Sequence, residues 1–331
     1  MVKTYNNLYE RICSFENLLL AARKAQKGKR FRENTARFNF NLEKELLKLQ
    51  KEVVSQTYKP GRYKQFIVYE SKKRIISAAP YRDRVVHHAL CNVIEPILEK
   101  SFIYDTYANR KEKGTHKAIL CFQDFCRRNK YVLKCDIVKY FDTINRGILF
   151  NIISGKIKDE KVLWLVQKIL NSTNNEYGIP IGNLTSQFFA NLYLDGFDHF
   201  VKEQLRCKYY IRYVDDFVIL DNDKSRLCEI KSEILKYLDG IKLQIHPDKT
   251  HVFSVGQGTD FLGFKIFPTH RLLKKENFFY FRRKLVKLRN LYRKKVINIQ
   301  KISNSILSWI AHVSWGDTWG LRTKLFNELY F

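Results

Sequence analysis

Residues 209–220 read YYIRYVDDFVIL, two apolar segments joined at the acidic pair Asp215 and Asp216. The aromatic and branched residues on both sides of this pair predict two β-strands, and Asp is common in the turn between strands. Two adjacent carboxylates inside a sheet repel each other and lose solvation. The pair is therefore either an ordinary solvated turn or a turn whose charge is compensated by a bound cation.

A third aspartate has similar surroundings. Asp136 follows the apolar residues YVLKC in the segment 131–141, which predicts a buried strand. If this strand lies beside the 209–220 hairpin, three carboxylates converge, and their hard oxygen ligands suit Mg²⁺. Two such ions ~3.5–4 Å apart can activate an attacking oxygen and stabilise a leaving one in phosphoryl transfer. We therefore expect a centre with two Mg²⁺ ions, for which Mn²⁺ can substitute.

The charge of the chain indicates a nucleic-acid partner. Its 331 residues include 60 Lys and Arg against 33 Asp and Glu, a formal net charge of +27, which suits a phosphate backbone. The segment 271–295 contains 11 Lys or Arg and one acidic residue, Glu276. Its apolar residues recur at helical spacing and predict a helix with one packed and one cationic face. We expect this helix to track duplex phosphates through Arg282, Arg283, Lys287 and Arg289.

Cysteine usage and hydropathy place the chain in the cytoplasm. The seven cysteines are scattered, with no close C-x-x-C pair, so they indicate reduced thiols rather than a disulfide framework or a zinc site. No uncharged stretch approaches the ~20 residues that a membrane-spanning helix needs. The N-terminus has no long apolar run, which argues against a signal peptide.

Other segments predict a mixture of helices and strands. Helical spacing of apolar residues occurs over 8–22, 42–53 and 83–99, and residues 64–77 predict a β-hairpin. Two further short strands are expected at 241–245 and 250–255. This order predicts an α+β fold with a sheet at its core.

Several ordered motifs resemble one family. Tyr213-Val214-Asp215-Asp216 resembles the YxDD box of reverse transcriptases, RNA-directed DNA polymerases. Other segments resemble the remaining boxes of that family in its order: the fingers around Arg74 and Arg84, motif A at DIVKYFD (136–142), motif B at GIPIGNLTSQ (178–187), motif D ending at PDKT (247–250) and the primer grip at FLGF (261–264). The set is similar to the bacterial group II intron-like branch, which implies a prokaryotic or phage-encoded protein.

The resemblance, which runs from about residue 60 to 265, implies a right-hand polymerase fold. We expect an N-terminal helical extension (1–60), fingers (61–130), a palm of antiparallel sheet with helices (131–268) and a basic helical thumb (269–331). The implied ligands are a template RNA, the cDNA duplex and dNTPs.

The resemblance also implies roles for individual residues. The three aspartates would hold the metal ions together with the backbone carbonyl of Ile137. Lys249 is either a general acid for pyrophosphate or a surface lysine. Phe141 would be the steric gate against a ribose 2′-hydroxyl, although an aromatic ring there could simply pack. The other implied contacts are Arg74, Lys73, Ile181, Gly182 and Gln187 around the dNTP, and Phe261, Leu262 and Gly263 in the primer grip.

Motif B departs from the usual Q-G-x-x-x-S-P. Ile181 replaces the glutamine and Gln187 replaces the proline, a combination that resembles the enzymes of diversity-generating retroelements. That resemblance implies errors opposite template adenines, a small basic accessory protein and a structured non-coding RNA. Two alternatives stay open: a reverse transcriptase that acts in phage defence on a dedicated non-coding RNA, and a non-catalytic RNA-binding scaffold.

Overall fold

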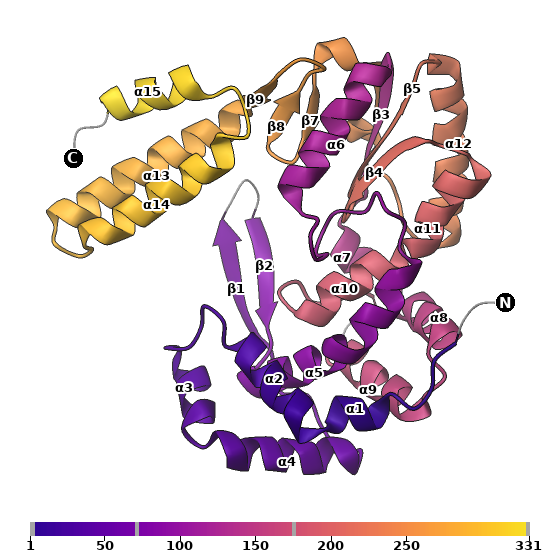
Figure 1. The fold of residues 1–331 in the computed structure, drawn as a ribbon, viewed down its shortest axis with the longest axis vertical. Helices are drawn as coiled ribbons and strands as arrows, with labels where there is room; N and C mark the ends of the chain where they lie inside the picture. Colours follow the sequence, from indigo (N-terminus) through magenta and orange to yellow (C-terminus); the bar gives the residue numbers. More distant parts are fainter. Residues whose placement is uncertain (1–3, 70–72, 174–176, 329–331) are drawn as a thin grey trace.

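A computed structural model of the chain describes residues 4–69, 73–173 and 177–328 (Figure 1). Its centre is a four-stranded antiparallel sheet with the strand order β4-β5-β3-β6. The strands are β3 (Tyr131–Asp136), β4 (Tyr209–Tyr213), β5 (Asp216–Asp221) and β6 (His251–Ser254). The segment 131–136 therefore lies beside the 209–221 hairpin, and the predicted α+β class is confirmed.

Helices cover both faces of this sheet. Side chains alternate along β3, so that Leu133 packs with the core beneath α12 (Lys224–Gly240), while Val132 packs with the core beneath α6 (Thr115–Arg128). Because both faces are buried, the strands are apolar almost throughout. The remaining helices of this part of the chain are α7 (Tyr140–Thr143), α8 (Arg146–Lys156), α9 (Glu160–Leu170), α10 (Leu184–Tyr193) and α11 (Asp195–His199).

A two-stranded hairpin stands apart from the central sheet. It pairs β1 (Lys64–Tyr69) with β2 (Lys73–Ala78) as the sequence predicted. Helix α5 (Tyr81–Leu98) follows, and α1 (Tyr9–Cys13), α2 (Phe15–Ala25), α3 (Glu33–Phe40) and α4 (Leu42–Val54) gather around it (Figure 1). The prediction of one continuous helix over 8–22 is wrong. Ser14 interrupts it, because its backbone is extended and its hydroxyl oxygen accepts the N–H of Asn17, which caps the start of α2.

Two strand predictions also need correction. The strand predicted over 131–141 ends at Asp136, because the chain turns through a left-handed Lys139 (φ +43°) into α7. Residues 241–245 form no regular strand, and only Ile245 makes an isolated bridge to Ile137. This segment instead holds the end of β3 in place, since the His246 N–H donates to the Asp136 carbonyl at 2.8 Å.

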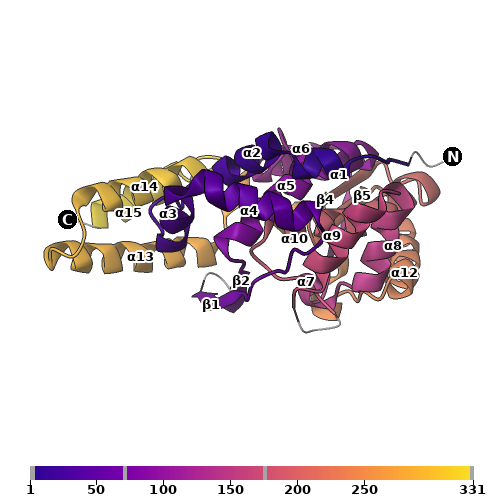
Figure 2. The ribbon, with the colours of Figure 1, turned by 90° about the horizontal axis from the view of Figure 1, so that it is seen from below.

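The last part of the chain forms a small sheet and a helical arm. The sheet contains β7 (Thr259–Phe261), β8 (Phe264–Ile266) and β9 (Arg271–Leu273) (Figure 1). The arm contains α13 (Lys275–Arg293), α14 (Ile299–Val313) and α15 (Trp319–Glu328) (Figure 2). Phe281 and Leu285 of α13 are buried, and the Phe281 ring stacks on Trp309 at 4.2 Å. The predicted helix with one packed and one cationic face is therefore present.

Two further features concern the helices and the cysteines. Across residues 4–69, 73–173 and 177–328, no helix combines the length and apolar character needed to cross a membrane. All seven cysteines are free thiols.

Candidate active site

Two of the three aspartates face each other across neighbouring strands. Asp136 is the last residue of β3 and Asp216 the first of β5, and they are direct partners in the antiparallel register. Directly opposed residues project from the same face of a sheet with their Cβ atoms about 5 Å apart. The strand pairing thus brings a carboxylate from each strand to one point.

The third aspartate lies in the turn between β4 and β5. Val214, which precedes Asp215, has a left-handed backbone (φ +58°), a costly conformation for a β-branched residue. The Asp215 carbonyl accepts the N–H of Ile137 at 3.3 Å. This bond ties the turn to the end of β3, so that Asp215 stays beside Asp136.

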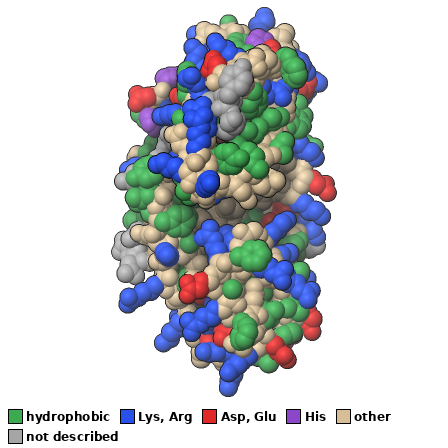
Figure 3. All heavy atoms as spheres, turned by 90° about the vertical axis from the view of Figure 1, so that its left-hand side faces the viewer, with side chains coloured by type: hydrophobic (Ala, Val, Ile, Leu, Met, Phe, Trp, Pro, Cys, Tyr) green, Lys and Arg blue, Asp and Glu red, His purple; other side chains and the backbone are tan. Residues whose placement is uncertain are grey.

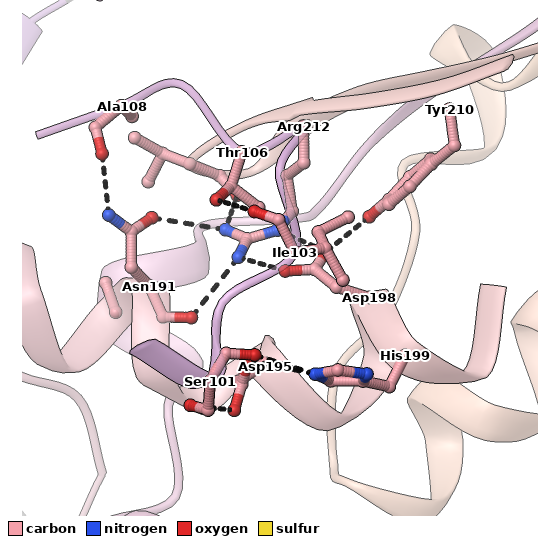
Figure 4. Close-up of polar contacts among 12 residues, drawn as sticks. Ser101, Ile103, Thr106, Ala108, Asn191, Asp195, Asp198, His199, Tyr210 and Arg212 are labelled. Carbon is pink, nitrogen blue, oxygen red and sulfur yellow. Dashed lines mark hydrogen bonds and ion pairs between the residues drawn. The ribbon is translucent and has the colours of Figure 1, made fainter. Parts of the chain in front are cut away.

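This turn is held by a buried cation, Arg212, whose contacts with Asn191 and Asp198 are drawn in Figure 4. The Arg212 side chain is 0% exposed, and its guanidinium donates to both Asp198 carboxylate oxygens at 2.7 and 2.6 Å. It also donates to the Val214 carbonyl at 3.0 Å and to the Asn191 side-chain oxygen at 3.2 Å. The Tyr210 hydroxyl donates to Asp198 at 2.6 Å. We call these residues (Asn191, Asp198, Tyr210, Arg212) the Arg212 cluster.

The charge of the Arg212 cluster is compensated internally. Burial alone would lower the pKa of Arg212, but the adjacent Asp198 carboxylate raises it, so the guanidinium remains charged. A fork of donors shared between a carboxylate and a main-chain carbonyl fixes direction as well as distance. The left-handed Val214 is therefore held by a rigid, fully paired group.

Asp216 lies in surroundings that disfavour its negative charge. Burial raises its pKa to about 7, with Lys134 opposing the shift and Asp136 and Asp215 adding to it. Among the described residues, its buried oxygen Oδ1 has no hydrogen-bond partner, and Lys134 Nζ lies 4.0 Å from it. A carboxylate in such surroundings is stabilised by a cation that coordinates it directly.

Lys249 contacts the carboxylate of Asp136. It ends a 3₁₀ turn (Pro247–Lys249), and its ammonium group lies 2.5 Å from Asp136 Oδ2. Within the described ranges, no three His, Cys, Asp or Glu side chains are close enough together to hold an ion by themselves. The carboxylates nevertheless fit Mg²⁺ as an open site, because that ion commonly takes one or two carboxylates and completes its shell with water and substrate phosphates.

Motif B lies against the two-stranded hairpin. The Ile181 carbonyl accepts the N–H of Ser77 at 2.9 Å. Gly182 has φ +118°, and a Cβ atom there would lie 2.9 Å from Ile76 Cγ2. Any side chain at this position would both strain the backbone and push the hairpin away.

The other residues predicted to contact the dNTP have varied surroundings. Arg74 is exposed on β2, and Gln187 is exposed on α10. Phe141 lies in α7, not in a strand as predicted, and is partly buried with its ring 5.8 Å from Tyr140. The backbone of Lys73 belongs to β2, but its side chain lies outside the described part of the chain.

A cavity of about 880 Å³ opens between the hairpin and motif B. Gln65, Ser77, Asp142, Arg146 and Ile181 contribute to its walls. None of the three aspartates does. The three carboxylates therefore lie outside the wall of this cavity, which is large enough for a nucleotide-sized ligand.

The predicted primer grip forms the β7–β8 turn. Phe261 is buried against Phe122, with their rings 5.1 Å apart, while Leu262 (φ +48°) and Gly263 (φ +91°) make the turn. The Gly263 carbonyl accepts the N–H of Lys274 and the side-chain amide of Asn277. This turn is thus fastened to the start of α13.

The cations predicted to contact duplex phosphates lie on α13. Arg282, Arg283 and Lys287 are exposed, Arg289 is partly buried, and Arg282 pairs with Glu328 at 3.4 Å. Figure 3 shows Lys and Arg side chains on both sides of a hollow in the face that carries the helical arm. This distribution suits a polyanion.

Comparison with known proteins decides the family. Residues 58–266 match the family described as reverse transcriptase (RNA-dependent DNA polymerase). The chain belongs to the reverse transcriptase family. This reverse transcriptase is similar to protein YkfC of Escherichia coli K12, with 28% identity over 281 residues that cover 70% of this chain and 72% of YkfC. It is also similar to the group II intron-encoded protein LtrA of Lactococcus lactis, with 22% identity over 68% of this chain and 50% of LtrA.

A solved structure extends the likeness to the fold. Apo telomerase from Candida tropicalis superposes with a TM-score of 0.52 at 14% identity, over 66% of this chain and 50% of that one. The right-hand polymerase fold predicted from the sequence is thereby confirmed. The reverse transcriptase described here spans about half the length of both LtrA and that telomerase.

Sequence reasoning missed the Arg212 cluster. The signal was present, because Arg212 is a lone cation inside the apolar run 209–220, and a buried cation requires an anionic partner. That partner, Asp198, comes from a short helix beyond motif B, and the local pattern does not identify it.

Proposed function

We propose that this reverse transcriptase makes DNA on an RNA template by phosphoryl transfer at Asp136, Asp215 and Asp216. The observation that carries the proposal is the register that pairs Asp136 with Asp216 beside a turn held by Arg212. Divalent ions, most simply two Mg²⁺, would activate the primer 3′-hydroxyl and stabilise the leaving pyrophosphate. Mn²⁺ has the same preference for oxygen ligands and can substitute.

The chain's own groups orient the reactants in this proposal. The three carboxylates and the Ile137 carbonyl would hold the ions, and Lys249, whose ammonium group contacts Asp136, would give a proton to pyrophosphate. Arg74 and Lys73 on the hairpin bind the triphosphate. Phe141 excludes a ribose 2′-hydroxyl, which gives a preference for dNTPs.

The duplex would lie along the arm. The β7–β8 turn at Phe261, Leu262 and Gly263 supports the primer end, and Arg282, Arg283, Lys287 and Arg289 contact the backbone phosphates. Such contacts make binding salt-dependent, with a slope that grows with the number of phosphates neutralised.

Primer extension tests this proposal. The purified chain, given Mg²⁺, dNTPs and a DNA primer on an RNA template, should extend the primer, and Asp215→Ala and Asp216→Ala should remove extension because each loses a metal ligand. Equal extension by the two variants would contradict the catalytic assignment. Binding without extension by any form would favour a scaffold.

We further propose that synthesis is error-prone opposite template adenine, as in a diversity-generating retroelement. The support is Ile181, whose apolar side chain replaces the glutamine usual in motif B and offers no hydrogen bond to check base-pair geometry. A small basic accessory protein and a structured non-coding RNA would then be partners.

Sequencing of cDNA copied from a defined RNA tests the fidelity proposal. Misincorporation should concentrate at adenines, and Ile181→Gln should lower it there more than at other bases. Uniformly low error at adenines, in a preparation that makes cDNA, would overturn the proposal.

A further inference from the structure

A second, smaller cavity is lined by the second half of motif B, from Gly182 to Gln187. It has a volume of about 170 Å³ and is bounded by the α2–α3 connection, α5 and the start of α10. Lys29, Arg84, His87, Asn183 and Gln187 contribute to its lining. We call it the α5–α10 cavity. Its volume is several times the roughly 30 Å³ that one water molecule occupies in the liquid.

Several buried polar atoms around this cavity have no protein partner. His87 is 1% exposed, and within the described ranges neither of its ring nitrogens makes a hydrogen bond; the same holds for Arg84 Nε. The amide of Asn183, also buried, makes no hydrogen bond of normal geometry, although it lies near the Tyr63 hydroxyl. An unpaired buried polar group costs about 1–3 kcal/mol, so such groups in a folded protein normally meet water or a ligand.

The charge around the cavity favours an anion. Among the described residues that line it, none is acidic. Burial and the neighbouring Arg84 and Arg32 lower the pKa of Lys29, which shows that cations are crowded here. Asn183 also precedes α10, a helix of ten residues whose N-terminus presents backbone N–H groups and the positive end of the helix dipole.

We infer that the α5–α10 cavity binds a phosphate group, supplied by the backbone of the nucleic-acid strand that the enzyme copies. The Arg84 guanidinium, the Lys29 ammonium, a His87 ring N–H and the Asn183 amide supply donors suited to phosphate oxygens. A strand is the source because consecutive residues of motif B line the two cavities, Gly182 this one and Ile181 the 880 Å³ one, so the two cavities are neighbours along motif B. The choice of strand rests on the proposed polymerase function.

Binding measurements on a neutralised backbone test this inference. Template–primer affinity is measured with EDTA present, so that a failure of catalysis leaves the result untouched. A single methylphosphonate linkage, which removes one charge, is placed at successive positions of the template strand. In the wild-type protein one position should weaken binding about tenfold, a loss of about 1.4 kcal/mol. In Arg84→Gln and in Lys29→Gln the same linkage should have little effect.

Two variants serve as controls for this comparison of the wild type with the cavity variants. Lys29→Gln changes an exposed loop residue, so folding should be unaffected even if Arg84→Gln is unstable. Lys224→Gln, an exposed cation at the start of α12, should retain the full wild-type response. If the same linkage weakens template–primer binding equally in the wild type and in both cavity variants, the inference that a strand phosphate binds in this cavity is overturned.

Inorganic phosphate distinguishes the two sources of the anion. Titration with phosphate, followed by the ring signals of His87 in NMR, should shift them in the wild type and not in Arg84→Gln. A phosphate shift without a linkage-specific effect would support the phosphate site and overturn the strand as its source. The absence of both effects would overturn the inference as a whole.

Discussion

The Arg212 cluster and the residues around the α5–α10 cavity both contain buried polar atoms, but they differ in how completely these atoms are hydrogen-bonded. In the Arg212 cluster the guanidinium meets both oxygens of Asp198 and the Val214 carbonyl. Around the cavity, Arg84 Nε and both His87 nitrogens meet no hydrogen-bond partner in the described chain. A buried cation that is fully paired fixes the backbone it touches, whereas one that is incompletely paired is prepared for a ligand.

The comparison implies different responses to substitution. Removal of one partner from the Arg212 cluster leaves a buried charge unpaired. Removal of a group beside the α5–α10 cavity relieves crowding among cations. Stability should therefore depend strongly on the first group, and ligand binding on the second.

The first expected effect of changing the Arg212 cluster is on activity. Arg212→Lys keeps the charge, but an ammonium group lacks the planar fork that reaches Asp198 and the Val214 carbonyl together. Displacement of the turn by about 1 Å should lower kcat on the order of 10²-fold, with template–primer affinity unchanged. Single-turnover kinetics and binding titrations measure the two quantities. A parallel loss of affinity would show a general structural role, and Arg226→Lys, on the surface, should alter neither.

The next effect is on folding. Asp198→Asn leaves Arg212 buried opposite a neutral group and should lower the free energy of unfolding by about 3–5 kcal/mol, measured in urea. Asp221→Asn is the matched control, because Asp221 pairs at 3.1 Å with Arg226, a solvent-exposed cation. This substitution should lower the free energy of unfolding by no more than about 1 kcal/mol. Equal losses in the two variants would remove the distinction between the clusters.

The buried His87 should make the stability of the protein fall at acid pH. Burial lowers the pKa of His87 to about 3, with His88 and Arg84 adding to the shift. The unfolded chain takes up this proton near pH 6.5, so stability falls as the pH drops below that value, by up to about 1.4 kcal/mol per pH unit, until about pH 3. His87→Leu should remove the part of this slope that His87 contributes, while His88, whose pKa burial lowers to about 4, still contributes its own part. His270→Leu, at an exposed position, should leave the whole slope unchanged. An unaltered slope in His87→Leu would contradict the assignment.

The smallest expected effect is at Arg84. Its guanidinium makes only part of its possible hydrogen bonds and lies 5.3 Å from the Tyr81 ring. Arg84→Gln should therefore change the free energy of unfolding by less than about 1 kcal/mol. A loss as large as that of Asp198→Asn would mean that Arg84 is a structural cation like Arg212.

Local patterns predicted the features that depend on nearby residues. The 209–220 hairpin, the 64–78 hairpin and the cationic α13 follow from the period of their apolar side chains. Errors arose where one residue changed the backbone direction, as at Ser14 and Lys139. The segment 241–245 has the composition of a strand, but its backbone bonds go to the end of β3 instead of a ladder.

The candidate site likewise contains features that local sequence predicts and features that it does not. The three aspartates could be found because carboxylates in apolar strands are costly. The pairing of Arg212 with Asp198, and the gathering of Lys29, Arg84 and Asn183 around one cavity, depend on contacts between distant segments. A period or a spacing carries no information about such contacts.

The central claim is that Asp136, Asp215 and Asp216 perform phosphoryl transfer, and single-turnover incorporation of one dNTP on an RNA template tests it most directly. Asp215→Asn should lower the rate by about 10³-fold or more while template–primer affinity, measured in the same samples, stays unchanged. Asp142→Asn, a nearby carboxylate in the wall of the 880 Å³ cavity, should lower the rate far less. An unchanged rate in Asp215→Asn, or an equal loss in Asp142→Asn, would contradict the account.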